Sequence, residues 1–149
     1  MPHIERTARL HWEGNLARGD GTIDAATSGA FTGLPFSLPS RISVINGKTS
    51  PEELLAAAHG GCLMTSIAGE LTAAGTPPGQ LEITCTIVMD EVEGQGHQIV
   101  GSVVDFVVEA DGVDDAALQA AVSVADEGCP FSALLKRAGA TVDVTARLA

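Results

Sequence analysis

Cysteines are the most reactive residues of this 149-residue chain, and two of the three lie in unusual surroundings. Cys62 follows a Gly60-Gly61 pair, and Cys129 precedes Pro130. Each glycine inside a helix costs about 1 kcal/mol relative to alanine, so we expect either close approach of another helix or a loosened turn with free N–H groups. Free N–H groups and the helix dipole lower the pKa of a thiol. Cys62 and Cys129 are therefore candidates for a reactive pair, and a buried, inert pair is the alternative.

The third cysteine belongs to a different pattern. Cys85 lies on the apolar side of an alternating segment, together with Leu81, Ile83, Ile87 and Met89. Such period-two alternation predicts a half-buried strand. We therefore interpret Cys85 as a small hydrophobic core residue.

His59 precedes Cys62 by three residues, so on a helix the two side chains share a face. The histidine could be a base, a metal ligand or a core residue hydrogen-bonded to a polar group, and the last interpretation is favoured. A metal site would combine His59, Cys62 and Cys129, but no fourth ligand has the spacing of a zinc pattern. We expect no metal and no cofactor.

Composition restricts the partners. The formal net charge of −11 argues against nucleic acid and anionic membranes, and an aromatic content of 3% leaves no stacking platform for bases. A small molecule or another protein remains as the partner.

An apolar content of 45% in 149 residues predicts one domain, residues 1–149, with a substantial core. Because residues 1–6 lack the apolar core of a signal peptide, we expect a cytoplasmic protein.

A long central helix is expected to position the cysteines. Ser50 and Glu53 form a capping-box pattern, Pro51 suits the first helical position, and Gly75 is a natural stop. The intervening residues are apolar nearly all round, which predicts a helix buried in the fold. Polar residues interrupt the run, so a membrane span is rejected; they are His59, Thr65, Ser66 and Glu70.

The remaining elements follow from turn signals and periodicity. We expect strands at 7–13 and 22–26, an edge strand or loop at 34–39, a short strand at 40–44, strands at 81–90 and 97–109, helices at 114–128 and 130–137, and a strand at 141–147. The predicted class is α+β, with mostly antiparallel sheets packed around the long central helix.

These residues resemble a known family over essentially the whole chain. The segment 50–62 is similar to the signature of the OsmC/Ohr family of thiol-dependent hydroperoxide reductases, and Gly128-Cys129-Pro130 is similar to its second cysteine motif. Residues 11–14 and 18–21 resemble its N-terminal strands, and more closely those of the OsmC branch. Gly60-Gly61 departs from the pattern, since bulkier small residues are common in relatives.

The resemblance implies an OsmC-like fold and a mechanism. Cys62 would be the peroxidatic cysteine, and its sulfenic acid would form a disulfide with Cys129. An external dithiol, a lipoyl group on a carrier protein, would reduce this bond. Arg18 matches the catalytic arginine that stabilises the thiolate and the developing alkoxide. Glu52 matches the carboxylate that orients this arginine.

The resemblance also implies an intertwined homodimer, in which the partner chain can supply Arg18. Arg41 is a second candidate near the site, with a surface charge as the alternative. An apolar set could line a channel favouring alkyl or lipid hydroperoxides, or could be ordinary core: Phe36, Leu38, Phe131 and Leu134. Two other functions stay open, namely a protein of this fold that binds a thiol or apolar ligand without turnover, and a metal-binding or structural role.

Overall fold

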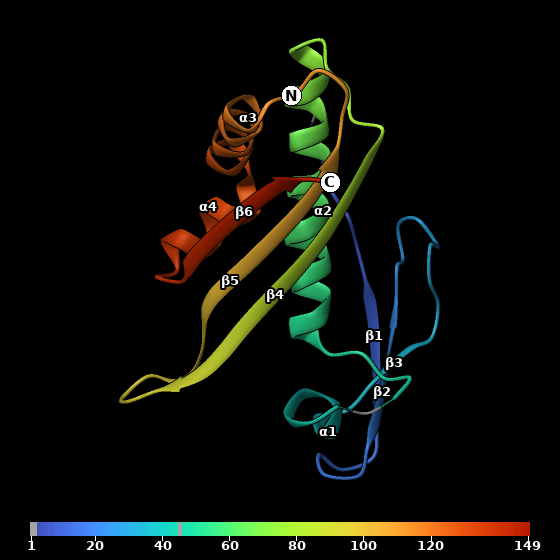
Figure 1. Cartoon of the computed structure of the whole chain (residues 1–149). Helices are drawn as coiled ribbons and strands as arrows, with labels where there is room; N and C mark the ends of the chain where they lie inside the picture. The colour runs from blue at the N-terminus through green and yellow to red at the C-terminus, as the bar shows by residue number, and fades with distance from the viewer. Residues whose placement is uncertain (1–2, 45) are drawn as a thin grey trace. The chain divides into compact units, whose positions relative to one another are not determined.

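The computed structural model describes residues 3–44 and 46–149 (Figure 1). Contacts within the chain divide it into two compact units, Met1–Leu54 and Leu55–Ala149. The expectation of one domain over residues 1–149 stays a prediction.

The first unit holds a three-stranded antiparallel sheet in the order β1-β2-β3, formed by Arg9–Glu13, Asp20–Asp24 and Leu34–Phe36. The edge position of β3 tolerates Pro35, which confirms the edge strand expected there. A Cβ atom at Gly21 would lie 2.2 Å from the Phe36 ring, so this position on β2 requires glycine. The Phe36 ring in turn packs beside Trp12, with ring centroids 5.7 Å apart.

The strand expected at 40–44 is wrong, because Leu38–Ile42 forms the short helix α1. Ser37 caps this helix: its Oγ accepts from the Ser40 N–H at 3.3 Å, and Ser40 Oγ accepts from the Ser37 N–H at 2.9 Å. Pro39 lies in the first turn, where its missing N–H costs nothing. These local bonds outweigh the β-branched residues that suggested a strand.

Helix α2, Pro51–Ala73, confirms the long helix predicted from the sequence. Its cap is half of a capping box: Ser50 Oγ accepts from the Glu53 N–H at 3.1 Å, but the Glu53 carboxylate accepts from Thr49 Oγ1 at 2.7 Å. Burial follows one stripe instead of the whole circumference, and its members are His59, Gly60, Leu63, Ile67 and Leu71. By length and composition alone α2 could cross a membrane. Leu63, Ile67 and Leu71 of this stripe belong to the hydrophobic core, which makes α2 a core helix.

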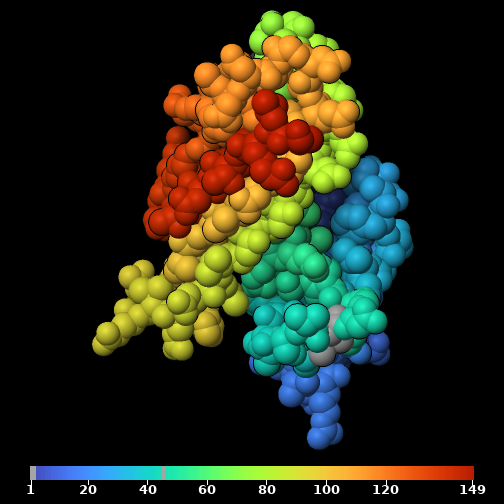
Figure 2. Space-filling model, viewed as in Figure 1, coloured from blue at the N-terminus to red at the C-terminus, as the bar shows by residue number. Residues whose placement is uncertain are grey.

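The second unit contains a sheet in the order β4-β5-β6, formed by Gln80–Val92, Gly96–Glu109 and Thr141–Leu148. Strands β4 and β5 form a long antiparallel hairpin, whose tip extends beyond the rest of this unit (Figure 2). Strand β6 pairs parallel to β5, because α3, Asp115–Gly128, and α4, Pro130–Arg137, carry the chain across between them. The predicted α+β class, with mostly antiparallel sheets, is confirmed.

The core of the second unit joins α2, β5 and α3. Leu63 and Ile67 of α2 are fully buried in one cluster with Val104 and Phe106 of β5 and Leu118 of α3. Burying side chains of this size contributes roughly 1.5–3 kcal/mol each. The strand and two helices therefore form a rigid support for the residues that α2 and α4 carry.

Candidate active site

Two cysteines that are far apart in the sequence meet in the second unit. Cys62, half-buried on α2, and Cys129, fully buried at the start of α4, place their Sγ atoms 3.2 Å apart. Both are free thiols. A disulfide, with its S–S length of about 2.05 Å, therefore requires a shift of only about 1 Å.

The start of α4 directs backbone N–H groups at both sulfurs. Cys129 is the N-cap residue, and its Sγ accepts from the Ser132 N–H at 3.5 Å. The N–H of Phe131 hydrogen-bonds to Cys62. Pro130 fills the first helical position. The prediction that Cys129 lies beside N–H groups with no partner inside the helix is confirmed, and the same turn also serves Cys62.

The pKa of Cys62 is nevertheless raised, to about 11. Burial is the largest cause, followed by the hydrogen bond and charge interaction with Cys129, and together they outweigh the lowering effects of the Phe131 N–H and the Ser66 side chain. The sequence had suggested a lowered pKa from free helical N–H groups. Desolvation is the larger effect, so this expectation is wrong for Cys62.

The glycine pair before Cys62 has a structural explanation at one of its positions. A Cβ atom at Gly60 would lie 3.2 Å from Cys85 Cβ and 3.3 Å from Ile83 Cγ2. Close approach is therefore the reason for this glycine, but the neighbour is strand β4 and not another helix. Gly61 has no atom within 4 Å of the same position, and α2 continues through both residues.

His59 is fully buried and hydrogen-bonded on both ring nitrogens. Nδ1 lies 2.8 Å from Ser102 Oγ on β5, and Nε2 lies 2.8 Å from Ser132 Oγ on α4. Desolvation lowers the pKa of His59 below 6.5, so the imidazole is neutral at pH 7. The prediction of a core histidine bonded to polar groups is confirmed. Sequence reasoning missed both serines, since no local pattern marks them.

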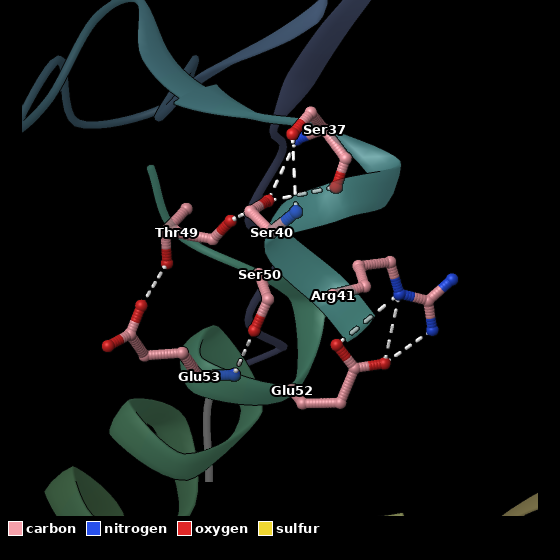
Figure 3. A network of polar contacts seen from close by, with 7 residues as sticks. All are labelled: Ser37, Ser40, Arg41, Thr49, Ser50, Glu52 and Glu53. Atoms are coloured by element: carbon pink, nitrogen blue, oxygen red, sulfur yellow. Dashed lines mark hydrogen bonds and ion pairs between the residues drawn. The ribbon is translucent and has the colours of Figure 1, made fainter. Parts of the chain in front are cut away.

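In the first unit, the predicted site residues Arg41 and Glu52 form an ion pair (Figure 3). Arg41 Nε lies 3.1 and 3.3 Å from the two carboxylate oxygens of Glu52. The hydrogen bond from Arg41 lowers the pKa of Glu52, and the same bond raises the pKa of Arg41. Arg18 lies in the β1–β2 turn, where its N–H donates to Asn15 Oδ1 at 3.0 Å. No ion pair between Arg18 and Glu52 forms in the described part of the chain. The roles assigned to both stay predictions.

A mostly apolar hollow of about 360 Å³ lies in the first unit. Its lining includes three residues predicted for the site, Phe36, Leu38 and Arg41, together with Ser37 and two that sequence reasoning missed, Trp12 and Leu16. Trp12 packs against Phe36 and lies opposite Gly21 of β2, and these contacts become visible only in the folded sheet.

The other two residues predicted to line a channel lie on α4 of the second unit. Phe131 packs half-buried against the hydrophobic core, whereas Leu134 is exposed.

Comparisons with known proteins agree on one family. The family model described as "OsmC-like protein" matches residues 45–145. The chain is 32% identical over 133 residues to the protein named "Peroxiredoxin OsmC" of Escherichia coli (strain K12), with 89% of this chain and 91% of the relative covered. The protein of the same name from Shigella flexneri matches with the same identity and coverage.

Solved structures agree on the fold. An organic hydroperoxide resistance protein OsmC from Legionella pneumophila has a TM-score of 0.71 at 20% identity, covering 100% of this chain and 99% of the other. An organic hydroperoxide resistance protein from Elizabethkingia anophelis has a TM-score of 0.76 at 18% identity, covering 100% of both chains.

Proposed function

This chain belongs to the OsmC-like family, and on that premise we propose that it is a two-cysteine peroxidase that reduces organic hydroperoxides to alcohols. The observation that carries the proposal is the 3.2 Å separation of the Cys62 and Cys129 sulfurs. Two free thiols at this distance can exchange two electrons with a peroxide and finish as a disulfide. Peroxidase-type redox chemistry also agrees with the names of the relatives.

The proposed reaction has two steps on the protein. The Cys62 thiolate attacks the O–O bond of the hydroperoxide, so that the alcohol ROH leaves and Cys62 becomes a sulfenic acid. The Cys129 sulfur then attacks the Cys62 sulfur, a disulfide forms and water leaves. The backbone N–H of Phe131 favours the anionic form of Cys62, and the backbone N–H of Ser132 donates to Cys129 Sγ.

A cation near the sulfur would favour the Cys62 thiolate in the first step, because the pKa of Cys62 is raised to about 11. We assign this role to the guanidinium of Arg18, which would stabilise both the thiolate and the departing alkoxide. Glu52, kept ionised by its pair with Arg41, would orient Arg18 within the same charged group.

The substrate would be an alkyl or lipid hydroperoxide instead of hydrogen peroxide. Support comes from the hollow lined by Trp12, Leu16, Phe36 and Leu38, whose apolar walls match a hydrocarbon chain, with Arg41 as its charged member. A spectrophotometric assay with cumene hydroperoxide and hydrogen peroxide tests this proposal. We expect a higher kcat/KM for cumene hydroperoxide and no turnover by Cys62→Ser. A preference for hydrogen peroxide would refute the substrate class.

A dithiol would complete the cycle, and a lipoyl group on a carrier protein is the proposed donor. A dithiol resolves its own mixed disulfide intramolecularly, so dihydrolipoamide should support faster turnover than an equal concentration of monothiol.

We further propose that the chain is cytoplasmic, works as one domain and forms an intertwined homodimer. The five residues of β1 are all exposed in the single chain, including Leu10 at 63%, which leaves a face for a partner.

One observation favours a second candidate, a binding protein without turnover. The raised pKa of Cys62 would leave the thiol almost entirely protonated at neutral pH. Stoichiometric binding of a thiol or an apolar ligand, with no peroxide consumed, would support that candidate.

A further inference from the structure

We propose that His59 is a positioning residue for disulfide formation, acting through Ser132 to hold Cys129 in reach of oxidised Cys62. This proposal rests on the proposed two-cysteine function and adds a residue to its second step.

Two contacts connect one turn of α2 with the first turn of α4. His59 precedes Cys62 by three residues on α2, and Ser132 follows Cys129 by three residues at the start of α4. Residues three apart lie on one side of a helix. One connection is the 3.2 Å contact between the two sulfurs, and the other is the 2.8 Å hydrogen bond between His59 Nε2 and Ser132 Oγ.

Burial makes the second connection costly to break. Both His59 and Ser132 are fully buried, as is Ser102, which bonds the other ring nitrogen at 2.8 Å. Losing one partner leaves a buried polar group unsatisfied, at a cost of about 1–3 kcal/mol. The bond from Nε2 to Ser132 links the ring directly to the first turn of α4, whereas the bond from Nδ1 to Ser102 faces β5.

One tautomer of His59 satisfies every group. With the proton on Nδ1, the ring donates to Ser102 Oγ, and the Ser132 hydroxyl donates to Nε2. The Ser102 hydroxyl can then donate toward Cys85 Sγ, 3.7 Å away. The Ser132 backbone N–H stays directed at Cys129 Sγ, 3.5 Å away. A single buried side chain thus orders the groups around the resolving sulfur.

Disulfide formation competes with over-oxidation of Cys62. After the first step, the Cys62 sulfenic acid either condenses with Cys129, releasing water, or reacts with a second hydroperoxide to give a sulfinic acid and alcohol. Condensation wins only if Cys129 is held in a reactive position, since a misplacement of about 1 Å can cost about 100-fold in rate. Loosening α4 should therefore slow disulfide formation and leave the first step unchanged.

Two serines give a matched pair of variants. Ser132→Ala removes the bond to α4 but keeps the N–H that faces Cys129, whereas Ser102→Ala removes an equally short bond to the same ring on the β5 side. Reduced protein is mixed with cumene hydroperoxide, quenched by alkylation and weighed intact. We expect Ser132→Ala to form the sulfenic acid at the wild-type rate, to form the disulfide at least about tenfold more slowly and to accumulate sulfinic acid. Ser102→Ala should form the disulfide within about twofold of the wild-type rate.

Substitutions of His59 test the same claim independently if an alanine variant fails to fold. The amide of His59→Gln falls near Nε2 and can still reach Ser132, whereas that of His59→Asn falls near Nδ1 and can reach only Ser102. We expect fast disulfide formation in His59→Gln and slow formation in His59→Asn. Equal slowing in both members of either pair would assign His59 a structural role only and overturn the proposal, as would a wild-type rate in Ser132→Ala.

A second oxidant separates this proposal from the proposed function. With 4,4′-dithiodipyridine, Cys62 displaces one thiopyridone to form a mixed disulfide, and Cys129 displaces the second. The release of the second thiopyridone should be slow in Ser132→Ala and fast in Ser102→Ala, even if no hydroperoxide is reduced. Wild-type protein inert to cumene hydroperoxide refutes the peroxidase; equal release from both serine variants refutes the role of His59.

Discussion

Removing the charge of Arg18 is the perturbation that most directly tests how Cys62 is activated. The pKa of Cys62 is raised to about 11 by causes that all lie within residues 55–149, and at that pKa roughly one thiol in 10⁴ is ionised at pH 7. A guanidinium about 4 Å from the sulfur would contribute about 4 kcal/mol at an effective dielectric constant of 20. Because Cys62 is only half-buried, solvent screening reduces this effect to about 2 pKa units. We therefore expect the pKa of Cys62 to be lower in the wild-type protein than in Arg18→Gln.

The assay is the pH dependence of Cys62 alkylation by iodoacetamide, followed by peptide mass spectrometry. At pH 7.5 a rise of about 2 pKa units lowers the thiolate fraction about 100-fold. The more basic thiolate is also a better nucleophile, so the observed rate should fall only about tenfold.

Arg9→Gln is the matched control, because it removes an exposed arginine from β1 of the same unit. It should leave the alkylation profile unchanged. If Arg18→Gln and the wild-type protein share one profile, Arg18 does not act on Cys62 and the assigned role is refuted.

Further predictions concern the glycine pair, the resolving cysteine and the buried histidine. Gly60→Ala should lower the free energy of unfolding by about 1–3 kcal/mol, since its Cβ would lie 3.2 Å from Cys85 Cβ. Gly61→Ala, whose Cβ would meet no atom within 4 Å, should raise the free energy of unfolding by up to about 1 kcal/mol. Urea unfolding measures both variants, and equal effects would contradict the packing argument. Cys129→Ser should let Cys62 reach the sulfinic acid under excess cumene hydroperoxide, and intact mass reads the two added oxygens; a stable sulfenic acid would contradict this. Because the pKa of His59 in the folded protein lies below 6.5, unfolded chains bind more protons under acidic conditions. The free energy of unfolding should therefore fall as the pH drops below about 6.5, by at most about 1.4 kcal/mol per pH unit. This contribution should vanish in His59→Gln, and an unchanged pH dependence of stability in that variant would contradict the prediction.

Much of the fold could be predicted from the sequence, since its signals are local. Alternation marked β4, apolar content marked α2, and Asp114 marked the start of α3, where its side chain accepts from the Ala117 N–H at 2.8 Å. The expectation of a strand at 40–44 failed because the cap at Ser37 decided the conformation of this segment. Capping bonds act over three residues and outweigh propensity in so short a segment.

The site was predictable only in part. Cys62 and Cys129 stood out through Gly60-Gly61 and Pro130, and His59 through its spacing from Cys62. The partners of His59 lie 43 and 73 residues away in the sequence, at Ser102 and Ser132. No pattern within either segment reports such contacts, because they arise only when β5 and α4 pack against α2.

The central claim is that Cys62 and Cys129 form one redox pair. The most direct measurement adds one equivalent of cumene hydroperoxide to the reduced protein, blocks free thiols and maps the peptides by mass spectrometry. We expect a single disulfide between Cys62 and Cys129, with Cys85 alkylated as a free thiol. A protein that leaves both thiols reduced, or that joins either cysteine to Cys85, would contradict it.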